Sequence, residues 1–321
     1  MNKKWKLKQN DENRISDISK KFNLTYIVAQ KLAEKDLTDK EIEIFLNPTR
    51  KDFHNPFKLP DMEVAVNRIL KAMENKEKIV IYGDYDADGI ISTTILKRFF
   101  GDRGIEVGTY IPNRLDEGYG LNEEAIKEIA NEGYNLMITV DCGITAVKEV
   151  ELAKSLGIDV IITDHHEVPE ELPKATAVVD AKRKDNEYPF NGLAGCGVAF
   201  KLTQALSIKL NLNENEWLKY IDIACIGTIS DIVPLIDENR VIAKLGLMLV
   251  AVTKNIGLKT LISMIGVKKI DSTFVSFGIS PRINACGRMG HQEDALNLFL
   301  TNDPIEARNL AIKLEEYNRQ R

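Results

Sequence analysis

Five short apolar runs restrict the folds open to this chain more than any other feature of its sequence. They are rich in β-branched residues and read KIVIYGD, IEVGTYIP, NLMITVD, IDVIITD and TAVVD. Segments with helical spacing of apolar residues separate the first four runs, namely GIISTTILKRFF, NEEAIKEIANEG and TAVKEVELAKSLG. Because right-handed crossovers join strands that alternate with helices, the pattern predicts an α/β protein with a Rossmann-like, mostly parallel five-stranded sheet flanked by helices.

Aspartates end four of these five runs. Asp84, Asp141 and Asp164 end three of them, and Asp180 ends the last. In open parallel sheets, ligands bind just beyond the carboxyl ends of the strands. We therefore expect these side chains to meet in one crevice although they are far apart in the sequence.

The first 60 residues differ in composition from the rest of the chain. Residues 1–60 are charged and contain three prolines in NPTRKDFHNPFKLPD, which indicates a short helical extension and an extended connector. Residues 61–300 are the predicted main domain, which turns helical after about residue 195. Residues 301–321 continue a helical pattern without a terminal cap, and we interpret them as the start of a linker helix to a domain that the chain lacks.

A helix is predicted at the start of the main domain. In DMEVAVNRILKAMENKEK, Asp61 is the expected N-cap, and Val64, Ile69, Leu70 and Met73 have the spacing of a buried helical face.

Composition limits the cellular compartment in which we expect the protein and the kinds of molecule that it can bind. The chain has 321 residues and a net charge of -5, and no apolar run approaches the roughly 20 residues that span a bilayer. The basic N-terminus lacks the apolar segment of a signal peptide, so we expect a cytoplasmic protein with no membrane partner. The negative charge does not favour nonspecific binding to nucleic acids, so a phosphate substrate would need metals or local arginines.

The four cysteines are widely separated. Cys142, Cys196, Cys225 and Cys286 form no CxxC pair, which argues against a zinc ribbon or a disulfide framework. We expect them to be reduced and to lie in the core or near a site.

The acidic segment YGDYDADGIIST predicts a divalent metal site. Asp84, Asp86 and Asp88 alternate before Gly89, and three carboxylates this close repel one another unless a cation neutralises them. A calcium-binding EF-hand is excluded because Ile95 stands where a bidentate glutamate is required and because a strand precedes the loop. A P-loop is excluded because no lysine follows the glycine. A solvated acidic turn remains the alternative.

Two further motifs add imidazole and carboxylate groups. VDCGI supplies Asp141, and TDHHEV supplies Asp164, His165 and His166. Imidazoles beside carboxylates suit Mn, Fe or Zn better than calcium. Adjacent residues in an extended backbone point in different directions, so one histidine is expected to bind metal while the other faces the substrate. HExxH chemistry is excluded because no second histidine follows Glu167 at the required spacing.

The remaining candidates are weaker when taken one at a time. In GTISDIVPL, Asp231 is flanked by apolar residues and must be paired, capping or ligating, with a helix cap or a buried salt bridge as the alternative. Arg114, Arg282, Arg288 and Asn284 are candidate contacts to substrate phosphates. Taken alone, each arginine is more readily interpreted as an ordinary surface or structural residue than as a phosphate contact.

The order of the motifs GDYDADG, VDCGI, TDHHEV and GTISDIVPL resembles the DHH phosphoesterase superfamily. The resemblance is greatest to the RecJ-type exonucleases, because FLNPTRKDFHNPFKLPDMEVAVNRI and SPRINACGRMG are similar to segments of that family. It covers essentially the whole chain and makes residues 61–300 the DHH catalytic domain. The resemblance also implies C-terminal domains after the linker helix, which we expect this chain to lack.

The resemblance implies a two-metal site for Mn²⁺ or Mg²⁺. One ion would be held by Asp88, Asp141, His165 and Asp231. The other would be held by Asp86 and the shared Asp141, with Asp84 as a helper, and His166 would face the scissile phosphate. The chain departs from the pattern at Tyr82, where many members of the superfamily carry a histidine.

The resemblance also implies an activity and its partners. It implies a 5′ to 3′ exonuclease that hydrolyses phosphodiester bonds of single-stranded DNA in DNA repair and recombination, with a helicase and a single-strand-binding protein as partners. One alternative is a relative that cleaves short oligonucleotides, cyclic dinucleotides or phosphoadenosine phosphate. The other is a catalytically inactive scaffold, which the acidic and imidazole residues argue against.

Overall fold

The chain forms two compact units, one ending at Phe53 and the other beginning at His54. The computed structural model describes residues 11–266 and 269–321. The described part of the first unit contains α1 (Glu12–Phe22), α2 (Tyr26–Ala33), α3 (Asp39–Leu46) and the short η1 (Arg50–Asp52). The helices pack around five buried residues, Ile15, Ile18, Ala29, Leu32 and Ile42. The domain limits that we read from the sequence stay a prediction.

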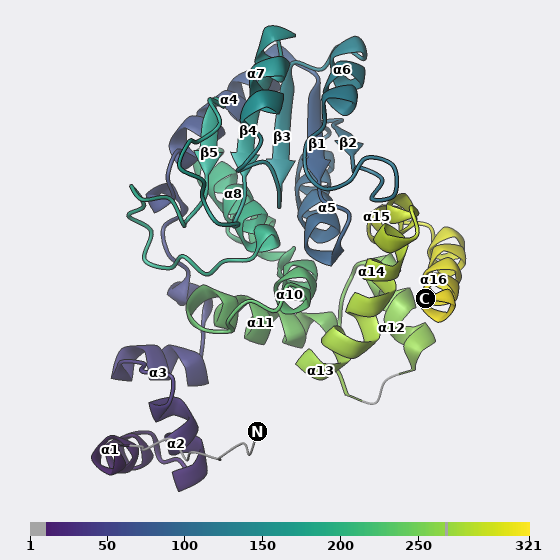
Figure 1. Cartoon of the computed structure of the whole chain (residues 1–321). Helices are drawn as coiled ribbons and strands as arrows, with labels where there is room; N and C mark the ends of the chain where they lie inside the picture. The colour runs from purple at the N-terminus through teal and green to yellow at the C-terminus, as the bar shows by residue number, and fades with distance from the viewer. Residues whose placement is uncertain (1–10, 267–268) are drawn as a thin grey trace, which may run out of the picture. The chain divides into compact units, whose positions relative to one another are not determined.

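A parallel sheet of five strands forms the centre of the second unit. Its strands are β1 (Ile79–Gly83), β2 (Gly108–Tyr110), β3 (Leu136–Val140), β4 (Asp159–Thr163) and β5 (Ala177–Val179). Their order across the sheet is β2-β1-β3-β4-β5, and each neighbouring pair is parallel (Figure 1). The predicted fold class and all five predicted strands are confirmed.

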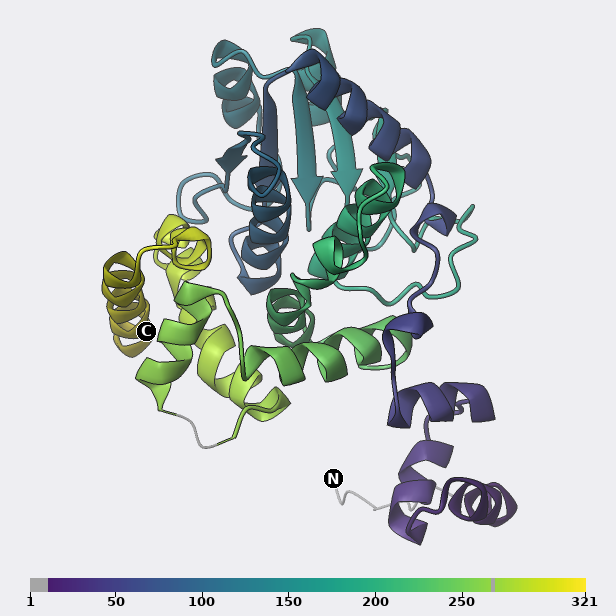
Figure 2. The ribbon, with the colours of Figure 1, turned by 180° about the vertical axis from the view of Figure 1, so that it is seen from behind.

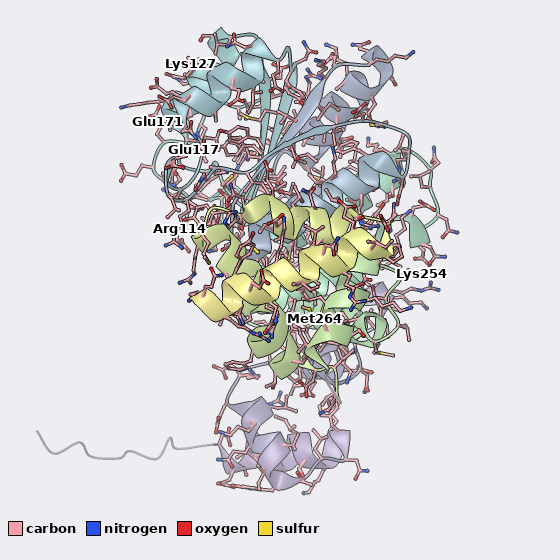
Figure 3. All side chains as sticks on the ribbon, turned by 90° about the vertical axis from the view of Figure 1, so that its right-hand side faces the viewer. Arg114, Glu117, Lys127, Glu171, Lys254 and Met264 are labelled. Atoms are coloured by element: carbon pink, nitrogen blue, oxygen red, sulfur yellow. The ribbon has the colours of Figure 1, made fainter. Side chains whose placement is uncertain are left out.

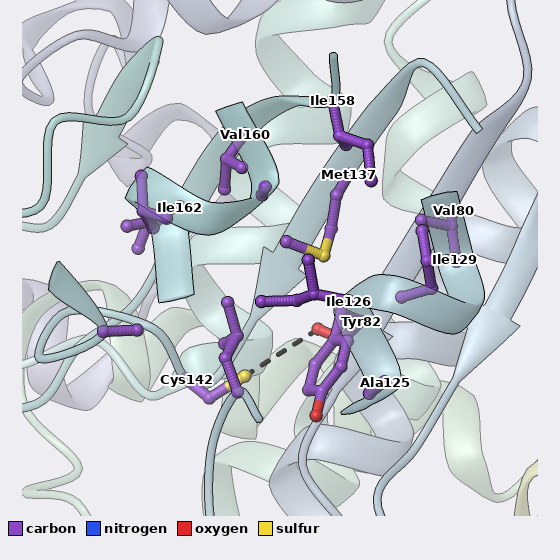
Figure 4. Close-up of a cluster of buried hydrophobic side chains, with 14 of the residues drawn as sticks. Val80, Tyr82, Ala125, Ile126, Ile129, Met137, Cys142, Ile158, Val160 and Ile162 are labelled. Carbon is purple, nitrogen blue, oxygen red and sulfur yellow. Dashed lines mark hydrogen bonds between the residues drawn. The ribbon is translucent and has the colours of Figure 1, made fainter. Parts of the chain in front are cut away.

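Helices cover both faces of the sheet. One face carries Val80 and Tyr82 of β1 and lies in an apolar cluster with residues of α6 (Glu123–Asn131) and α7 (Val147–Ser155) (Figure 4). The opposite face is covered by α4 (Met62–Asn75), α5 (Ala87–Gly101) and α8 (Gly195–Lys209) (Figure 2). Because strands buried on both faces have no solvated side, they read as continuous apolar runs.

The start of α4 differs from the prediction. Asp61 occupies the N-cap position, but its φ is 52° and its side chain caps no helix N–H. Its carboxylate instead accepts hydrogen bonds from the N–H of Val178 and from Arg183, at 3.1 and 2.6 Å, so it joins α4 to the end of β5. Val64 is also not a core residue, since 47% of it is exposed, and the buried face runs through Ala65 and other residues.

A helical region lies on the side of the sheet toward which the strands point (Figure 1). Its elements are α9 (Asn215–Leu218), α10 (Ile221–Ser230), α11 (Asp237–Val250), α12 (Ile256–Ile265), α13 (Ser272–Phe274), η3 (Val275–Ile279), α14 (Ser280–Arg288), α15 (Gln292–Leu300) and α16 (Pro304–Gln320). Within the described ranges, no helix combines the length and the apolar character needed to cross a membrane.

A buried ion pair fixes this helical region to the sheet. Lys201 of α8 lies 2.8 Å from Glu238 of α11, and both side chains are fully buried. Glu238 also accepts hydrogen bonds from the Tyr188 hydroxyl and from the N–H of His54, just before the short η2 (Pro56–Lys58). A buried charge pair with its remaining hydrogen bonds satisfied avoids the cost of an unpaired buried charge, so these contacts hold the elements in one arrangement.

The cysteines are free and buried, as the sequence predicts. Cys142 directly follows Asp141 at the end of β3, and its thiol donates to the carbonyl of Tyr82 at 3.8 Å (Figure 4).

Candidate metal centre

The acidic loop after β1 turns directly into α5. Asp86 is the N-cap of α5, and its carboxylate accepts hydrogen bonds from the N–H groups of Asp88 and Gly89 at 2.8 and 3.1 Å. Asp84 is buried, and burial together with the nearby charge of Asp86 raises its pKa to about 7. Burial and the charge of Asp88 likewise raise the pKa of Asp86. The loop therefore concentrates negative charge that only a cation can offset fully.

The N-terminus of α8 holds the third carboxylate of the acidic motif, that of Asp88 in the first turn of α5. Asp88 accepts hydrogen bonds from the N–H groups of Gly195 and Cys196 at 2.7 and 3.0 Å. The free N–H groups and the dipole at a helix N-terminus stabilise an anion there. Sequence reasoning missed this role, although the glycine-rich GLAGCG before the helix was a usable signal.

Asp141 lies at the centre of the site. It follows β3 with a φ of 60°, a left-handed conformation that aspartate tolerates better than most residues. Its side chain is buried, and its Oδ1 lies 3.0 Å from Nε2 of His165. Burial, with the charges of Asp88 and Asp86, raises the pKa of Asp141 well above its usual value.

The rings of the two adjacent histidines lie side by side, with centroids 4.4 Å apart, but their pKa values shift in opposite directions. The His165 side chain is only 11% exposed, and its Nδ1 lies 3.7 Å from Oδ2 of Asp231. Burial lowers its pKa, which keeps the imidazole neutral and able to bind a metal. The His166 side chain is 44% exposed, and its Nδ1 lies 2.7 Å from Oδ1 of Asp164. That hydrogen bond raises the pKa of His166 and favours its charged form.

Asp164 organises the turn that carries both histidines. Its buried carboxylate accepts hydrogen bonds from the N–H groups of His165, His166 and Ile144. Burial alone would raise the pKa of Asp164, but the hydrogen bond and the charge of His166 outweigh it and leave the pKa below its usual value. Sequence reasoning found Asp164 at a strand end but gave it no role in the site.

Asp231 reaches the centre from the end of α10. It is the C-cap residue of that helix, and burial with the charges of Asp88 and Asp86 raises its pKa to about 8. Asp231 is thus a C-cap by position and lies beside His165. Its role as a metal ligand stays a prediction.

Three overlapping groups of side chains have ligand atoms within 4.8 Å of one another. They are Asp84 with Asp86 and Asp141, Asp88 with His165 and Asp231, and Asp141 with His165 and His166. Four atoms of these residues are buried without a hydrogen-bond partner in the described part of the chain: Asp84 Oδ1, Asp141 Oδ1, His165 Nε2 and Asp231 Oδ2. Asp141 Oδ1 and His165 Nε2 face each other at 3.0 Å but do not form a hydrogen bond. Since buried polar atoms normally have partners, unpartnered oxygen and imidazole nitrogen atoms fit divalent cations.

The three arginines predicted to contact phosphates differ in their surroundings. Arg114, which is labelled in Figure 3, lies over the ring of Tyr85, with its Cζ 5.3 Å from the ring centroid. Burial and the positive charges of Arg321 and Arg114 lower the pKa of Arg288. Arg282 is instead paired with Glu315 of α16 at 2.6 Å.

Asn284 supports the acidic loop from the helical region. Its side-chain oxygen accepts the N–H of Ala87 at 2.9 Å, next to Asp86 and Asp88. All four predicted phosphate contacts stay predictions, and the contacts of Arg282 and Asn284 describe structural roles.

Tyr82 does not belong to the groups that could hold a metal. Its ring lies in the apolar cluster under α6, stacked on Tyr110 with centroids 5.1 Å apart, and its hydroxyl donates to the carbonyl of Gly120 at 3.0 Å. A hollow of about 430 Å³ is lined by Asp164 and His166 together with residues such as Tyr119, Gly143 and Glu149.

The comparison with known proteins agrees with this arrangement. Residues 78–228 match the family model described as DHH family, N-terminal domain. A protein of Bacillus subtilis (strain 168) named single-stranded-DNA-specific exonuclease RecJ is 42% identical over 321 residues, which covers 99% of this chain and 40% of that protein. The chain therefore spans less than half the length of this relative.

Solved structures of RecJ from Thermus thermophilus are also similar to the chain. The complex with Mn²⁺ has a TM-score of 0.84 at 31% identity, covering 98% of this chain and 45% of that one. The complex with Mg²⁺ has a TM-score of 0.74 at 29% identity, covering 98% and 42%. The fold predicted from the sequence is thus shared with these structures.

Proposed function

Because the chain belongs to the DHH family, we propose that it is the catalytic part of a metal-dependent exonuclease that hydrolyses phosphodiester bonds of single-stranded DNA from 5′ to 3′. The observation that carries the proposal is the set of unpartnered buried ligand atoms around Asp141 and His165. A scaffold protein gains nothing from burying carboxylates that raise one another's pKa.

In this proposal two Mn²⁺ or Mg²⁺ ions occupy the centre. Asp88, Asp141, His165 and Asp231 hold one of them, and Asp86 with the shared Asp141 holds the other, helped by Asp84. The chemistry that such a pair supplies when bound is activation of a water and stabilisation of the leaving oxygen in a displacement at phosphorus. The RecJ structures with Mn²⁺ and Mg²⁺ support the choice of metals.

His166 is the residue that we assign to the substrate. Asp164 accepts a hydrogen bond from the Nδ1–H of His166 and raises its pKa, which favours a second proton on Nε2. A charged imidazole that is 44% exposed beside the carboxylates can donate a hydrogen bond to an oxygen of the scissile phosphate. In this way His166 stabilises negative charge that develops in the transition state.

The proposed setting is DNA repair and recombination. Such an enzyme acts on strands that a helicase has separated and a single-strand-binding protein has covered, so we propose these two as partners. Chromosomal DNA of a bacterium lies in the cytoplasm, and four free cysteines fit a reducing compartment of that kind.

The test is hydrolysis of end-labelled DNA in Mn²⁺ by the purified chain. We expect stepwise shortening of a 20-nucleotide single strand from its 5′ end, little cleavage of the same sequence as duplex, and no cleavage in EDTA. Cleavage of a dinucleotide or of phosphoadenosine phosphate without cleavage of the long strand would favour the small-substrate alternative. Absence of all metal-dependent cleavage would contradict the proposal.

A further inference from the structure

The register of the sheet brings a lysine to the edge of the metal centre. Thr163 of β4 pairs with Val179 of β5, and the N–H of Asp164 donates to the carbonyl of Val179 at 3.1 Å. The segments that follow β4 and β5 therefore leave the sheet side by side. His166 and Lys182 occupy equivalent positions, each three residues after the paired residues Thr163 and Val179.

Local hydrogen bonds fix the backbone of Lys182. Its N–H donates to Oδ1 of the buried Asp180 at 2.7 Å. The neighbouring Arg183 is held by Asp61 and Asp185 at 2.6 Å each, so the turn after β5 is tied on both sides. The backbone of Lys182 is therefore placed by contacts that do not involve its own ammonium group.

The ammonium group itself is only weakly engaged. Nζ of Lys182 lies 3.0 Å from Oε1 of Glu167, the residue after His166. The Glu167 side chain is 90% exposed and that of Lys182 is 29% exposed. An ion pair with so exposed a partner contributes little, because water screens both charges. A stronger anion can therefore displace Glu167 at small cost.

A cation at this position would offset negative charge that two divalent metal ions leave at the metal centre. The carboxylates of Asp84, Asp86, Asp88, Asp141, Asp164 and Asp231 outnumber the four positive charges of two divalent ions. Lys182 lies at the same edge of the sheet, because its segment follows the strand paired with the one that leads into His165 and His166. A DNA phosphate approaching from the β5 side would otherwise meet excess negative charge.

Lys182 also complements the arginines at the opposite edge. Arg114 follows β2, the strand at one end of the sheet order, and Lys182 follows β5, the strand at the other end. The metal-binding candidates after β1, β3 and β4 lie between them. Cations on both sides of an acidic centre allow a phosphate backbone to cross it.

We propose that Lys182 contacts a backbone phosphate of the bound single strand on the β5 side of the metal centre, exchanging Glu167 for that phosphate. This inference rests on the proposed single-stranded substrate. Lys182 then contributes affinity for the strand without taking part in bond cleavage.

Binding of a fluorescein-labelled 12-nucleotide single strand, measured by anisotropy in Ca²⁺ across salt concentrations, tests the proposal. We expect Lys182→Met to weaken binding about fivefold or more at low salt and to reduce the slope of log affinity against log salt by about 0.7, the value for one phosphate contact to a single strand. Lys182→Arg should bind within about twofold of the wild type. The control Lys184→Met removes an exposed lysine two residues away and should change neither the affinity nor the slope.

Glu167→Gln gives an independent measurement. Because it frees Lys182 from its competing partner, it should tighten binding slightly in the wild-type background and have no effect in the Lys182→Met background. Hydrolysis by the wild type in Mn²⁺ separates this proposal from the proposed function. If the wild type cleaves the strand but Lys182→Met binds with unchanged affinity and slope, only the role of Lys182 is wrong. If the wild type neither binds nor cleaves the strand, both proposals fall.

Discussion

Gly195 lies so close to Asp141 that a Cβ atom added to the glycine would stand 2.4 Å from Oδ1 of the aspartate. The N–H of the same glycine donates to Oδ2 of Asp88 at 2.7 Å. The first residue of α8 thus fits between two carboxylates of the candidate metal centre. Only a residue without a side chain allows both carboxylates to keep these positions.

We therefore predict that Gly195→Ala weakens Mn²⁺ binding by about 10- to 100-fold, the usual effect of disturbing groups that orient metal ligands. Isothermal titration calorimetry measures this directly. The matched control is Gly101→Ala in α5, where an added Cβ meets nothing within 4 Å, and which should bind Mn²⁺ like the wild type. Unchanged affinity in Gly195→Ala would show that Asp141 can move without cost.

Asp141→Ala should reduce hydrolysis by at least about 10³-fold, because the carboxylate proposed to be shared by two ions is lost. The fold should persist, with a circular dichroism spectrum like that of the wild type, since removal of a buried like charge relieves repulsion. Asp159→Ala changes an aspartate at the opposite end of the same sheet and serves as the control. Near-normal turnover in Asp141→Ala would contradict the two-metal assignment.

The two histidines should separate metal binding from catalysis. His165→Ala should weaken Mn²⁺ binding, because the buried neutral imidazole is lost, whereas His166→Ala should bind Mn²⁺ normally and lose turnover. Calorimetry and steady-state rates on the same preparations measure both properties. Equal Mn²⁺ affinity in the two variants would rule out the division of roles between them.

Metal affinity should rise with pH between about 6 and 8. In the metal-free protein the pKa of Asp84 is about 7 and that of Asp231 about 8, so both carboxyls are partly protonated in this range. Because a ligand must lose its proton to bind a cation, each proton released adds up to about a factor of ten in affinity per pH unit below its pKa. Titration in buffers of different ionisation enthalpy counts these protons, and constant affinity over the range would contradict the prediction.

The same shifts set the sign of a stability change. Both carboxyls bind protons more tightly in the folded than in the unfolded protein, so the metal-free protein loses stability as pH rises from about 4 through about 8. Saturating Mn²⁺ should reverse this trend, since binding to the folded state stabilises it increasingly as the ligands ionise. Thermal unfolding with and without the metal provides the comparison.

The local sequence pattern was sufficient to predict features that depend only on neighbouring residues. Continuous β-branched runs specify buried parallel strands, and an aspartate after such a run must lie at the carboxyl edge of the sheet, as Asp84, Asp141 and Asp164 do. Local pattern was insufficient at Asp61, where propensity indicates a cap but the side chain binds Arg183 and the N–H of Val178. Propensity is a weak signal that a strong tertiary contact overrides.

The sequence by itself determined the α/β fold and the five strands and identified the acidic and imidazole residues proposed to bind metal, because period, composition and short motifs are properties of neighbouring residues. Only the tertiary structure decided which groups complete that set. The N–H groups of α8 reach Asp88 across 107 positions of sequence, Arg282 is occupied by Glu315, and Lys182 lies beside the centre through the pairing of β4 with β5. These relationships arise from packing between segments far apart in the chain, and no local pattern of residues encodes which distant partner a side chain will meet.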